Sequence, residues 1–519
     1  MISMTRVPSK AYNAAADLIE RNLVAGRGAK VAYIDDSGKH TYAELAERVG
    51  RCANALREAC IEPGQRLALG LLDTIDFPVC FLGAIKAGIV PIPLSTRSTA
   101  TDFAAILADS LPQAAIMSHE VMPVFEEAAK LARWTGKVYV SGGEGNDNAL
   151  HDRMAAASPD AQTAATGPDD VCFWLYSSGS TGKPKGVIHR QSSLMQTAEL
   201  YGQGVLGITE HDVVFSAAKL FFAYGLGNAL TFPISVGATA ILCSGRPTPA
   251  VVNAILREQR PTIFFGVPTL FNALLACADL PGKGEHALRF CVSAGEALPE
   301  KVGAAWRERT GVDIVDGIGS TELLHIFVSN RPGNVRYGTT GRVVPGYHVR
   351  LVDETGKPAP PGEIGELHVN GPTVAIGYWN NAEKTGDTFV DNWVRTGDRF
   401  KQTPEGDYVH CGRNDDMLKV GGIYVSPLEV EGALLAHEAV LEAAVVGAAD
   451  EMGLVKPKAY VVLSPGVVAS SALVQSLQQF VKARLTPHKY PRWIEIIPAL
   501  PKTATGKVRR YALRQRGMT

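Results

Sequence analysis

The sequence predicts an α/β protein with a large N-terminal domain of parallel and mixed sheets flanked by helices, a small antiparallel unit, and a small α+β domain at the C-terminus. Three observations predict this fold class. Short apolar segments alternate with helical ones up to about residue 330, and a Gly- and Pro-rich alternating pattern follows from about residue 335. A compact helix and strand pattern resumes after residue 422. The length of 519 residues also exceeds what one hydrophobic core normally organises.

The first clear helix is predicted over residues 40–59, where apolar residues recur every three or four positions. Thr41 is suited to be its N-cap, with Glu44 three residues later completing a capping box. Apolar segments typical of buried strands then recur between helical stretches, at residues 66–73, 89–94, 213–218, 239–243, 262–267, 289–295 and 313–319. Short apolar strands separated by helices indicate parallel sheets that are covered on both faces.

The antiparallel unit is predicted over residues 335–371, where apolar positions alternate and the sequences DETGK and PPGE indicate turns. The polar segment GRNDD at 412–416 is a candidate linker. Beyond it the pattern predicts helices at 426–437 and 473–485, and strands at 439–448, 459–466 and 492–500. The basic cluster RRYALRQR at 509–516 is interpreted as a solvated tail helix.

The composition of the chain indicates which partners and which cellular compartment to expect. The 51 Lys and Arg residues against 52 Asp and Glu residues leave a net charge of −1, so nucleic acid is not expected as a partner. The eight cysteines include no CxxC pair, which argues against a disulfide framework or a zinc site. No apolar run reaches about 18 residues, and the first residues lack an apolar signal core. We therefore expect a cytoplasmic protein without a membrane partner.

The stretch YSSGSTGKPKGVIH at 176–189 is the strongest local signal. It follows a predicted strand at 171–176 and precedes a predicted helix at 187–201, and its glycines let backbone N–H groups converge on an anion. The order differs from the nucleoside-triphosphatase pattern G-x-x-x-x-G-K-[ST], because Pro184 stands where that pattern has Ser or Thr. The segment therefore predicts a polyphosphate-binding loop of another class, and an ATPase or kinase has only Gly182 and Lys183 in its favour.

Together with that loop, five further segments resemble, in order, the motifs of the adenylate-forming superfamily of acyl-CoA synthetases, firefly-type luciferases and nonribosomal-peptide adenylation domains. The resemblance extends from about residue 30 to 516, and the segments are DGIGSTELLHIF (316–327), GELHVNGPTVAIGYWNN (365–381), WVRTGD (393–398), GRNDDMLKVGG (412–422) and PKTATGKVRR (501–510). The resemblance implies ATP, Mg²⁺ and coenzyme A as cofactors.

It also implies roles for individual residues at the nucleotide. The β- and γ-phosphates would be held by Ser177, Ser178, Gly179, Ser180, Thr181, Gly182 and Lys185. Thr181 and Glu322 would form the Mg²⁺ environment, Asp398 and Arg413 would contact the ribose, and the adenine would lie against Gly295, Glu296, Ala297 and Asp316. Taken alone, Glu322 is typical of a surface helix start, and Asp398 and Arg413 of a turn aspartate with a paired arginine.

For catalysis the resemblance implies that Lys507 stabilises the charge that develops at the α-phosphate, with Glu322 and Thr181 as further catalytic residues. Asp415 would be the hinge between an N-terminal domain, residues 1–414, and a mobile C-terminal lid, residues 415–519. After rotation of the lid, Gly421 and Gly422 would line the pantetheine tunnel, and Lys419 would act in this second conformation only.

The acid pocket is predicted from Phe222, Ala223, Tyr224 and Gly225, together with Ile318, Gly319 and His325. An aromatic wall with a small floor favours a flat ring over a flexible tail. FFAYGLGNAL (221–230) and GSTELLHIF (319–327) resemble benzoate–CoA ligases. Phe222 departs from the histidine that many relatives of the superfamily have there, and His325 is either a pocket residue or a structural histidine bonded to backbone.

The predicted function is ATP-dependent activation of an aromatic carboxylic acid, benzoate, to acyl-AMP with release of pyrophosphate, followed by acyl transfer to coenzyme A through domain alternation. The alternatives are a ligase for another small aryl, cinnamate-type or short-chain acid, and an adenylation enzyme that loads a carrier protein. The expected partners are the acid, ATP and coenzyme A, a second copy of the chain, and a lysine acetyltransferase or deacetylase acting on Lys507.

Overall fold

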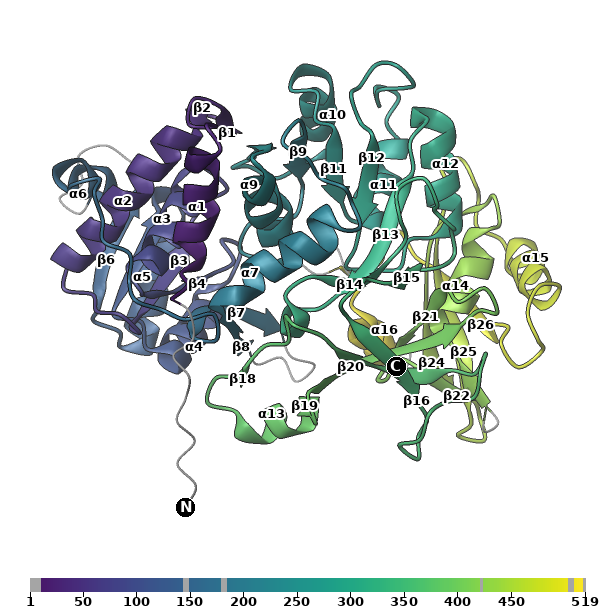
Figure 1. The fold of residues 1–519 in the computed structure, drawn as a ribbon. Helices are drawn as coiled ribbons and strands as arrows, with labels where there is room; N and C mark the ends of the chain where they lie inside the picture. The colour runs from purple at the N-terminus through teal and green to yellow at the C-terminus, as the bar shows by residue number, and fades with distance from the viewer. Residues whose placement is uncertain (1–10, 143–148, 179–183, 421–422, 503–507, 517–519) are drawn as a thin grey trace.

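The computed structural model describes residues 11–142, 149–178, 184–420, 423–502 and 508–516. The elements follow one another from an N-terminal α/β layer, through a second sheet, to a smaller unit that contains the C-terminal helix (Figure 1). This mixed α/β architecture confirms the predicted fold class. Along the described parts of the chain, no helix is both long and apolar enough to cross a bilayer.

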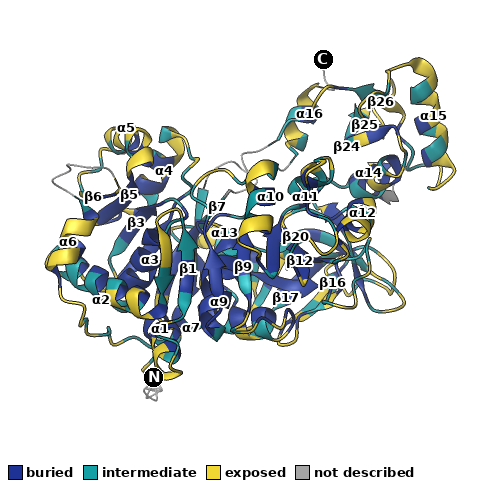
Figure 2. Cartoon of the chain, turned by 90° about the horizontal axis from the view of Figure 1, so that it is seen from above, coloured by how far each residue is buried: buried dark blue, intermediate teal, exposed yellow. Residues whose placement is uncertain are grey.

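A parallel sheet of four strands forms the N-terminal layer, in the order β4 (Val90–Pro93), β3 (Arg66–Gly70), β5 (Ala114–Ser118) and β6 (Lys137–Ser141). Successive side chains of β3 point to opposite faces, so Leu67 and Leu69 join one buried cluster and Ala68 another. The first face is covered by helices α2 (Tyr42–Glu58) and α3 (Asp76–Lys86), and the second by α4 (Ala100–Ser110) and α5 (Met122–Ala132) (Figure 2). Helices on both faces explain why these strands are apolar throughout.

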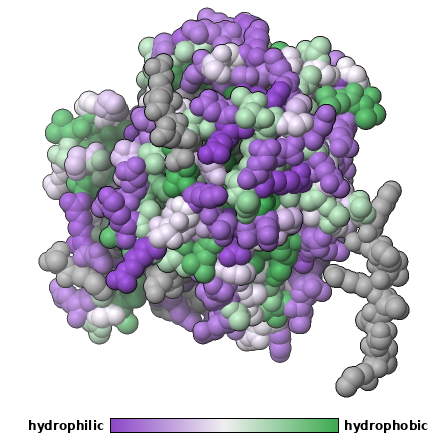
Figure 3. Space-filling view, turned by 90° about the vertical axis from the view of Figure 1, so that its left-hand side faces the viewer, coloured by the Kyte–Doolittle hydropathy of each residue, from purple (hydrophilic) through white to green (hydrophobic). Residues whose placement is uncertain are grey.

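Helix α2 begins as predicted. The Thr41 side chain accepts from the backbone N–H of Glu44, and the Glu44 carboxylate accepts from the backbone N–H of Thr41, which completes the capping box. On the side of the molecule shown in Figure 3, hydrophilic side chains alternate with scattered apolar ones, as is usual for the surface of a folded domain.

The second sheet has nine strands and is parallel in its centre and antiparallel at both ends. Its order is β15 (Arg342–Val343), β14 (Ile326–Ser329), β13 (Ile314–Gly319), β12 (Phe290–Ser293), β11 (Ile263–Gly266), β9 (Val213–Ser216), β10 (Thr239–Ile241), β1 (Val31–Asp35) and β2 (Gly38–Thr41). The helices of this region are α1 (Ala14–Val24), α7 (Gln191–Thr197), α8 (Ala223–Leu226), α9 (Phe232–Val236), α10 (Pro249–Glu258), α11 (Pro268–Leu275) and α12 (Glu300–Thr310). Helix α6 (Leu150–Ala156) packs against α2 and β6 of the N-terminal layer, and α13 (Ala382–Thr388) lies beside β18 (Gly377–Tyr378), β19 (Phe389–Val390) and β20 (Trp393–Gln402).

The polyphosphate-loop region differs from the prediction in one respect. The helix expected over 187–201 begins only with α7 at Gln191, because residues 184–190 form a strand, β8 (Pro184–Arg190). β8 pairs antiparallel with β7 (Val171–Ser178), and β18 (Gly377–Tyr378) adds a third strand. The β-branched residues Val187 and Ile188 fit the pleated strand and face Leu175 and Trp174. The loop therefore joins two strands of a hairpin and does not precede a helix.

The predicted antiparallel unit is present and is larger than expected. It contains β16 (His348–Val352), β17 (Gly365–Asn370), β20 (Trp393–Gln402) and β19 (Phe389–Val390), with β21 (Tyr408–Arg413) paired to β20. The segment WVRTGD thus lies in the central strand β20 of this unit.

The C-terminal unit confirms the helices and strands predicted between residues 426 and 500. Its elements are β22 (Leu418–Val420), β23 (Ile423–Val425), β24 (Val440–Ala449), β25 (Val455–Leu463), β26 (Trp493–Ile496), α14 (Pro427–Leu435), α15 (Ser471–Lys482) and α16 (Arg510–Arg516). The helix predicted at 509–516 is present as α16 but is packed and not solvated, because Leu513 is fully buried and Arg510 pairs with Glu431. A separate buried cluster, which includes Val430, Val461 and Leu477, holds α14 and α15 against the sheet. Asp415 lies in the turn between β21 and β22.

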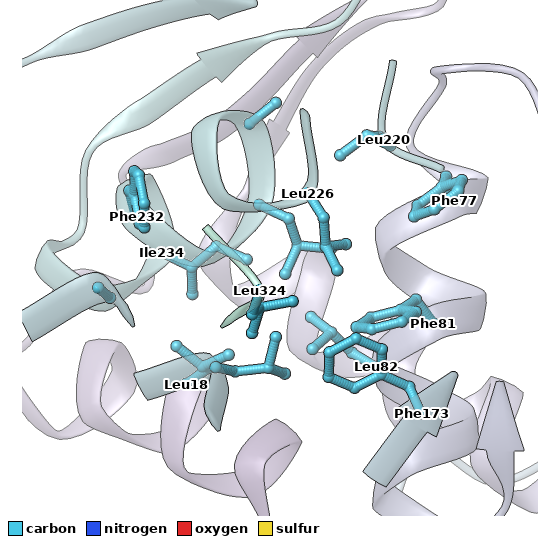
Figure 4. Close-up of a cluster of buried hydrophobic side chains, with 14 of the residues drawn as sticks. Leu18, Phe77, Phe81, Leu82, Phe173, Leu220, Leu226, Phe232, Ile234 and Leu324 are labelled. Atoms are coloured by element: carbon cyan, nitrogen blue, oxygen red, sulfur yellow. The ribbon is translucent and has the colours of Figure 1, made fainter. Parts of the chain in front are cut away.

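The core that supports the candidate acid pocket gathers side chains from distant parts of the sequence. Figure 4 shows Leu18, Phe77, Phe81, Leu82, Phe173, Leu220, Leu226, Phe232, Ile234 and Leu324 in one buried cluster. Leu220 and Leu226 flank the predicted pocket segment 222–225, so that segment is attached to the core at both ends.

Candidate active site

The first group of site residues is a cluster of Glu322, Tyr378 and Lys185. Glu322 lies in a short 3-10 turn, Thr321–Leu323, directly after β13, and its carboxylate accepts a hydrogen bond of 2.8 Å from the Tyr378 hydroxyl. The Lys185 ammonium lies 5.4 Å from the centroid of the Tyr378 ring. Burial lowers the pKa of Lys185, with Lys384 acting in the same direction. A bound polyanion would offset both effects, so this cluster suits a phosphate chain.

Strand pairing brings these three residues together. Tyr378 is aligned with Val187 of β8, and the N–H of Trp379 donates to the carbonyl oxygen of Gly186 at 2.8 Å. The N–H of Ala375 donates to the carbonyl oxygen of Glu322 at 2.9 Å. The segment around Tyr378 therefore connects the polyphosphate-loop hairpin to the turn that carries Glu322.

Of the residues predicted to hold phosphates, Ser177 lies in β7 aligned with Lys185, and Ser178 is aligned with Pro184 at the end of the ladder. Gly179, Ser180, Thr181 and Gly182 lie outside the described residues. Within the described ranges there is no group of three or more His, Cys, Asp or Glu side chains arranged to hold a metal. Mg²⁺ is commonly held by one or two carboxylates plus substrate phosphates, and Glu322 beside the loop fits that mode.

The second group is Asp398, Arg413 and His410 in the antiparallel unit. Asp398 and Arg413 are cross-strand partners in β20 and β21, and Arg413 Nη1 donates to Asp398 Oδ2 at 3.1 Å. His410 Nε2 lies 3.3 Å from Asp398 Oδ1. Gly397 has φ +71°, a backbone conformation that favours glycine, and it lies close to the Arg413 guanidinium. The paired arrangement is the alternative noted from sequence, and ribose contact by both residues stays a prediction.

The third group is the predicted adenine surface. Gly295 has φ +94°, a conformation that favours glycine and turns the chain sharply after β12. Asp316 is buried on β13, where burial raises the pKa of its carboxyl well above the usual value. Among the described residues, Asp316 Oδ1 has no hydrogen-bond partner. A buried acceptor without a partner fits a ligand donor such as an exocyclic amine.

The predicted acid pocket also comes together in the structure. Phe222 is 37% exposed, and the Tyr224 hydroxyl donates to the carbonyl oxygen of Val292 at 3.2 Å. The rings of Tyr224 and His325 are 5.5 Å apart. A Cβ on Gly319 would lie 2.5 Å from the carbonyl oxygen of His325, so the backbone folds back closely within the segment 319–327. Ala223, Gly225 and Ile318 lie in these same segments.

His325 has the backbone contact of the structural alternative, and its role in the acid pocket stays a prediction. It is 3% exposed, and its Nε2 lies 3.3 Å from the carbonyl oxygen of Tyr224 and 3.2 Å from Oδ1 of Asn228. Burial lowers its pKa to about 3, so the ring is neutral and Nε2 is the donor. Within the described structure Nδ1 has no partner. His325 is thus bonded to backbone, and its ring packs against those of Tyr224 and Phe232.

The remaining predicted residues belong to the C-terminal unit. Lys507, Gly421 and Gly422 lie outside the described residues. Lys419 lies on β22 and forms a 3.8 Å ion pair with Glu354. Arg510 pairs with Glu431, and the negative charge of Glu296 also helps to raise the pKa of its guanidinium.

Sequence reasoning did not assign a role to Tyr378 or Asn228, which contact Glu322 and His325. Tyr378 had a signal, because it belongs to the GYW triplet within the segment 365–381. Asn228 had none, since its contact with His325 depends on how the chain folds back after α8.

A carboxylate, a lysine and a tyrosine gathered beside the β7–β8 hairpin of a mixed α/β fold are groups expected in a nucleotide-binding enzyme. The sequence pattern described as "AMP-binding enzyme" matches residues 20–379, and that of "AMP-binding enzyme C-terminal domain" matches residues 429–507. The chain belongs to the AMP-binding enzyme family, which confirms the superfamily resemblance.

Individual relatives match over nearly the whole length. A benzoate–CoA ligase from Thauera aromatica is 57% identical over 98% of this chain and 97% of its own. A 4-hydroxybenzoate–CoA/benzoate–CoA ligase from Rhodopseudomonas palustris is 48% identical over 98% and 95%. The crystal structure of a benzoate CoA ligase from Burkholderia xenovorans LB400 superimposes with a TM-score of 0.91 at 50% identity, covering 97% of this chain and 100% of that one.

Proposed function

We propose that this protein is an ATP- and Mg²⁺-dependent ligase that converts benzoate to benzoyl-AMP, releases pyrophosphate, and then transfers the benzoyl group to coenzyme A. The 57% identity to a benzoate–CoA ligase over 98% of this chain carries the proposal. The packing of the Tyr224 ring against the neutral His325 ring also supports it, because a flat apolar acid would meet aromatic and uncharged groups there. The carrier-loading and short-chain alternatives have no comparable support.

At the nucleotide end, Lys185 and the residues of the hairpin loop would neutralise the β- and γ-phosphates that leave as pyrophosphate. Tyr378 holds the Glu322 carboxylate in one orientation through its 2.8 Å hydrogen bond. Mg²⁺ held there would screen charge on the phosphate oxygens. Asp398, Arg413 and the unpartnered Asp316 oxygen would position the ribose and the adenine. Lys507 would approach the α-phosphate and the substrate carboxylate, where negative charge increases during adenylation.

We also propose that residues 1–414 and 415–519 are two bodies that rotate about Asp415 between the half-reactions. Asp415 lies in a turn between strands, as expected of a hinge. The second arrangement would place Lys419, Gly421 and Gly422 at the path of the pantetheine arm. The present arrangement, in which the charge of Glu296 acts on Arg510, is the one expected for adenylation.

Further partners and the compartment are also proposals. All eight cysteines are free thiols, which supports a reducing compartment such as the cytoplasm. Acetylation of Lys507 by a lysine acetyltransferase would remove the charge that adenylation needs, and a deacetylase would restore it. A homodimer is proposed as the assembly, to be tested by light scattering of the purified protein.

The function is tested with a panel of carboxylic acids, measuring acid-dependent ATP–pyrophosphate exchange and acyl-CoA formation. We expect benzoate to exceed acetate and hexanoate in kcat/KM by at least about 100-fold, because those acids cannot fill the aromatic wall. The kcat/KM values for fluoro- and hydroxybenzoates should differ from that for benzoate by no more than about 10- to 200-fold, which is the discrimination that one ring substituent normally gives. If benzoate is no better than acetate or hexanoate, the proposed substrate is wrong.

A further inference from the structure

A buried ion pair lies next to the predicted acid pocket. Lys219 is three residues before Phe222, and its side chain is only 10% exposed. Its ammonium donates to the carbonyl oxygens of Cys243 and, at 2.7 Å, of Gly245. It also lies 3.9 Å from the carboxylate of Asp73, whose side chain is 5% exposed. Burying these two charges costs free energy, so their partners and geometry determine how the segment folds.

Asp73 comes from a different layer of the molecule, a few residues after β3. Its Oδ1 accepts a hydrogen bond of 3.2 Å from the backbone N–H of Leu220. The Leu220 side chain lies beside Phe77 in the buried cluster of Figure 4. One carboxylate thus contacts two consecutive residues, through the ammonium of Lys219 and the backbone of Leu220.

The backbone of Lys219 in turn touches the pocket segment. The N–H of Phe222 donates to the carbonyl oxygen of Lys219 at 3.0 Å, and that of Leu226 donates to the carbonyl oxygen of Phe222 at 2.8 Å. A Cβ on Gly225 would lie 2.1 Å from the carbonyl oxygen of Lys219, so the two backbones are in close contact. Any shift of Lys219 would therefore move Phe222 and Gly225.

We propose that Asp73 and Lys219 are positioning residues for the acid substrate, and that their ion pair holds residues 219–225 in the geometry that receives the aromatic carboxylate. The inference rests on the proposed function. Neither side chain belongs to the predicted pocket, so both act through the backbone of the segment that carries Phe222, Tyr224 and Gly225.

The charges around Asp73 give the pair a pH dependence. Lys219 and Arg97 attract the carboxylate and Cys243 lies nearby, yet burial raises the pKa of Asp73 to about 6. Asp73 is therefore ionised at neutral pH and becomes protonated as the pH falls through about 6, which weakens its attraction to Lys219. The KM for benzoate should rise over the same window, since the segment is then held less firmly.

The raised pKa of Asp73 affects the stability of the fold in the opposite direction to its effect on the KM for benzoate. Because the folded-state pKa lies above the usual value, the fold favours protonated Asp73, and this contribution is present at low pH and lost as the pH rises through about 6. Asp73→Asn imitates the protonated group, so its melting temperature at neutral pH should not fall below that of the wild type. A loss of function without a loss of stability distinguishes positioning from a general structural role.

The test measures benzoate-dependent ATP–pyrophosphate exchange by the full-length protein. For Asp73→Asn we expect the KM for benzoate to rise about tenfold at neutral pH, the scale of a displacement below 1 Å, with the KM for ATP within about twofold. The further rise in KM below about pH 6 should disappear in this variant. Lys219→Met should have a similar effect, and the double variant should be no worse than the worse single one, because both act through one pair.

Asp212→Asn is the matched control. Asp212 is also buried and pairs with Arg289 at 2.6 Å, but it lies at the start of β9, away from the pocket segment. We expect this variant to lose thermal stability while its KM for benzoate stays unchanged. Absence of benzoate-dependent exchange in the wild type would overturn the proposed function. Normal wild-type exchange together with an unchanged KM in Asp73→Asn, or equal increases for benzoate and ATP, would overturn the positioning inference alone.

Discussion

At the residue scale, the two ends of the candidate site differ in charge. The nucleotide end gathers ionisable groups, with Lys185 beside Glu322 and Asp398 beside Arg413. The acid end presents aromatic rings and a neutral histidine, because burial lowers the pKa of His325 to about 3. In the proposed function, an aromatic acid would bury its ring here without meeting an unpaired charge and would direct its carboxylate toward the phosphates.

The hydrogen bond from the Tyr378 hydroxyl to Glu322 can be tested directly by mutation. In Tyr378→Phe the Glu322 carboxylate loses its 2.8 Å hydrogen bond and is no longer held in one orientation. Hydrogen bonds to charged groups contribute about 1.5–3 kcal/mol, so we expect kcat/KM for ATP to fall about 10- to 100-fold. The KM for benzoate should change little, since the acid pocket is intact. Steady-state exchange kinetics at varied ATP and Mg²⁺ measure both.

Tyr42→Phe is the matched control for that experiment. The Tyr42 hydroxyl is also buried and donates to the carbonyl oxygen of Ala238 at 2.6 Å, outside the candidate site. Its loss should reduce thermal stability and leave the ATP kinetics unchanged. Equal ATP kinetics in Tyr378→Phe and Tyr42→Phe would show that the Tyr378 hydroxyl has no role at the nucleotide.

Residue types were more predictable than residue contacts. Motif spacing identified Glu322 and Asp398 because each belongs to a local segment that can be compared directly with a family. The contact of Tyr378 with Glu322 was not predictable, since it depends on β18 joining β8 almost 200 residues away in the chain. The Asp73–Lys219 pair was equally unpredictable, because Asp73 follows β3 of the four-stranded sheet and Lys219 follows β9 of the nine-stranded sheet.

At the scale of elements, the polyphosphate loop shows where periodicity misleads. Residues 187–201 contain apolar positions at helical spacing, yet the first four belong to β8. Residues 187–190 form a strand because they pair with β7 and β18. These partners cannot be recognised from the sequence of the segment alone. Because residues 184–190 form a strand, no helix N-terminus follows Lys185 directly, and the proposed phosphate contacts would not gain from a helix dipole at this point.

The C-terminal helix α16 gives a prediction about stability. Arg510 Nη2 donates to both carboxylate oxygens of Glu431 on α14, at 2.7 and 2.8 Å, and the Leu513 side chain is fully buried. Arg510→Ala leaves the Glu431 carboxylate, which is 8% exposed, without its main countercharge. Removing one member of a buried pair costs about 3–5 kcal/mol, so we expect a loss near 3 kcal/mol in urea denaturation monitored on the C-terminal unit.

Arg484→Ala serves as the comparison for Arg510→Ala. Arg484 is an exposed residue at the end of α15 whose guanidinium stacks on the Phe480 ring at 3.5 Å. Its removal should cost about 1 kcal/mol or less. If Arg510→Ala is as stable as Arg484→Ala, the pair with Glu431 does not hold α16 in place.

At the scale of the whole molecule, the fold class was predictable because strand and helix periodicities are local. The relative arrangement of the two units was not, since it depends on weak contacts between surfaces that are far apart in sequence. Lys301 of α12 donates to the carbonyl oxygen of Leu435 at 3.3 Å, and Arg510 is attracted by Glu296. Both contacts are polar, which suits an interface that the proposed rotation would open.

The proposed rotation about Asp415 leads to the last prediction. Asp415 lies in the turn between β21 and β22, and proline there would fix φ near −65° and restrict the rotation of the C-terminal unit. Because the charge of Glu296 acts on Arg510 in the present arrangement, we expect Asp415→Pro to retain benzoate-dependent exchange within about threefold. Formation of benzoyl-CoA from supplied benzoyl-AMP should fall by at least about 100-fold, since that step needs the other arrangement. Single-turnover assays of each half-reaction measure the two rates separately.

Asp415→Ala separates the hinge role from any role of the carboxylate, because alanine removes the side chain and leaves φ free. We expect this variant to keep both half-reactions within about threefold of the wild type, as a rotation needs backbone freedom and not a charge at this position. Equal loss of thioester formation in the alanine and proline variants would assign the effect to the carboxylate. Full rates of both half-reactions in Asp415→Pro would place the hinge at another residue and move the proposed boundary away from 414–415.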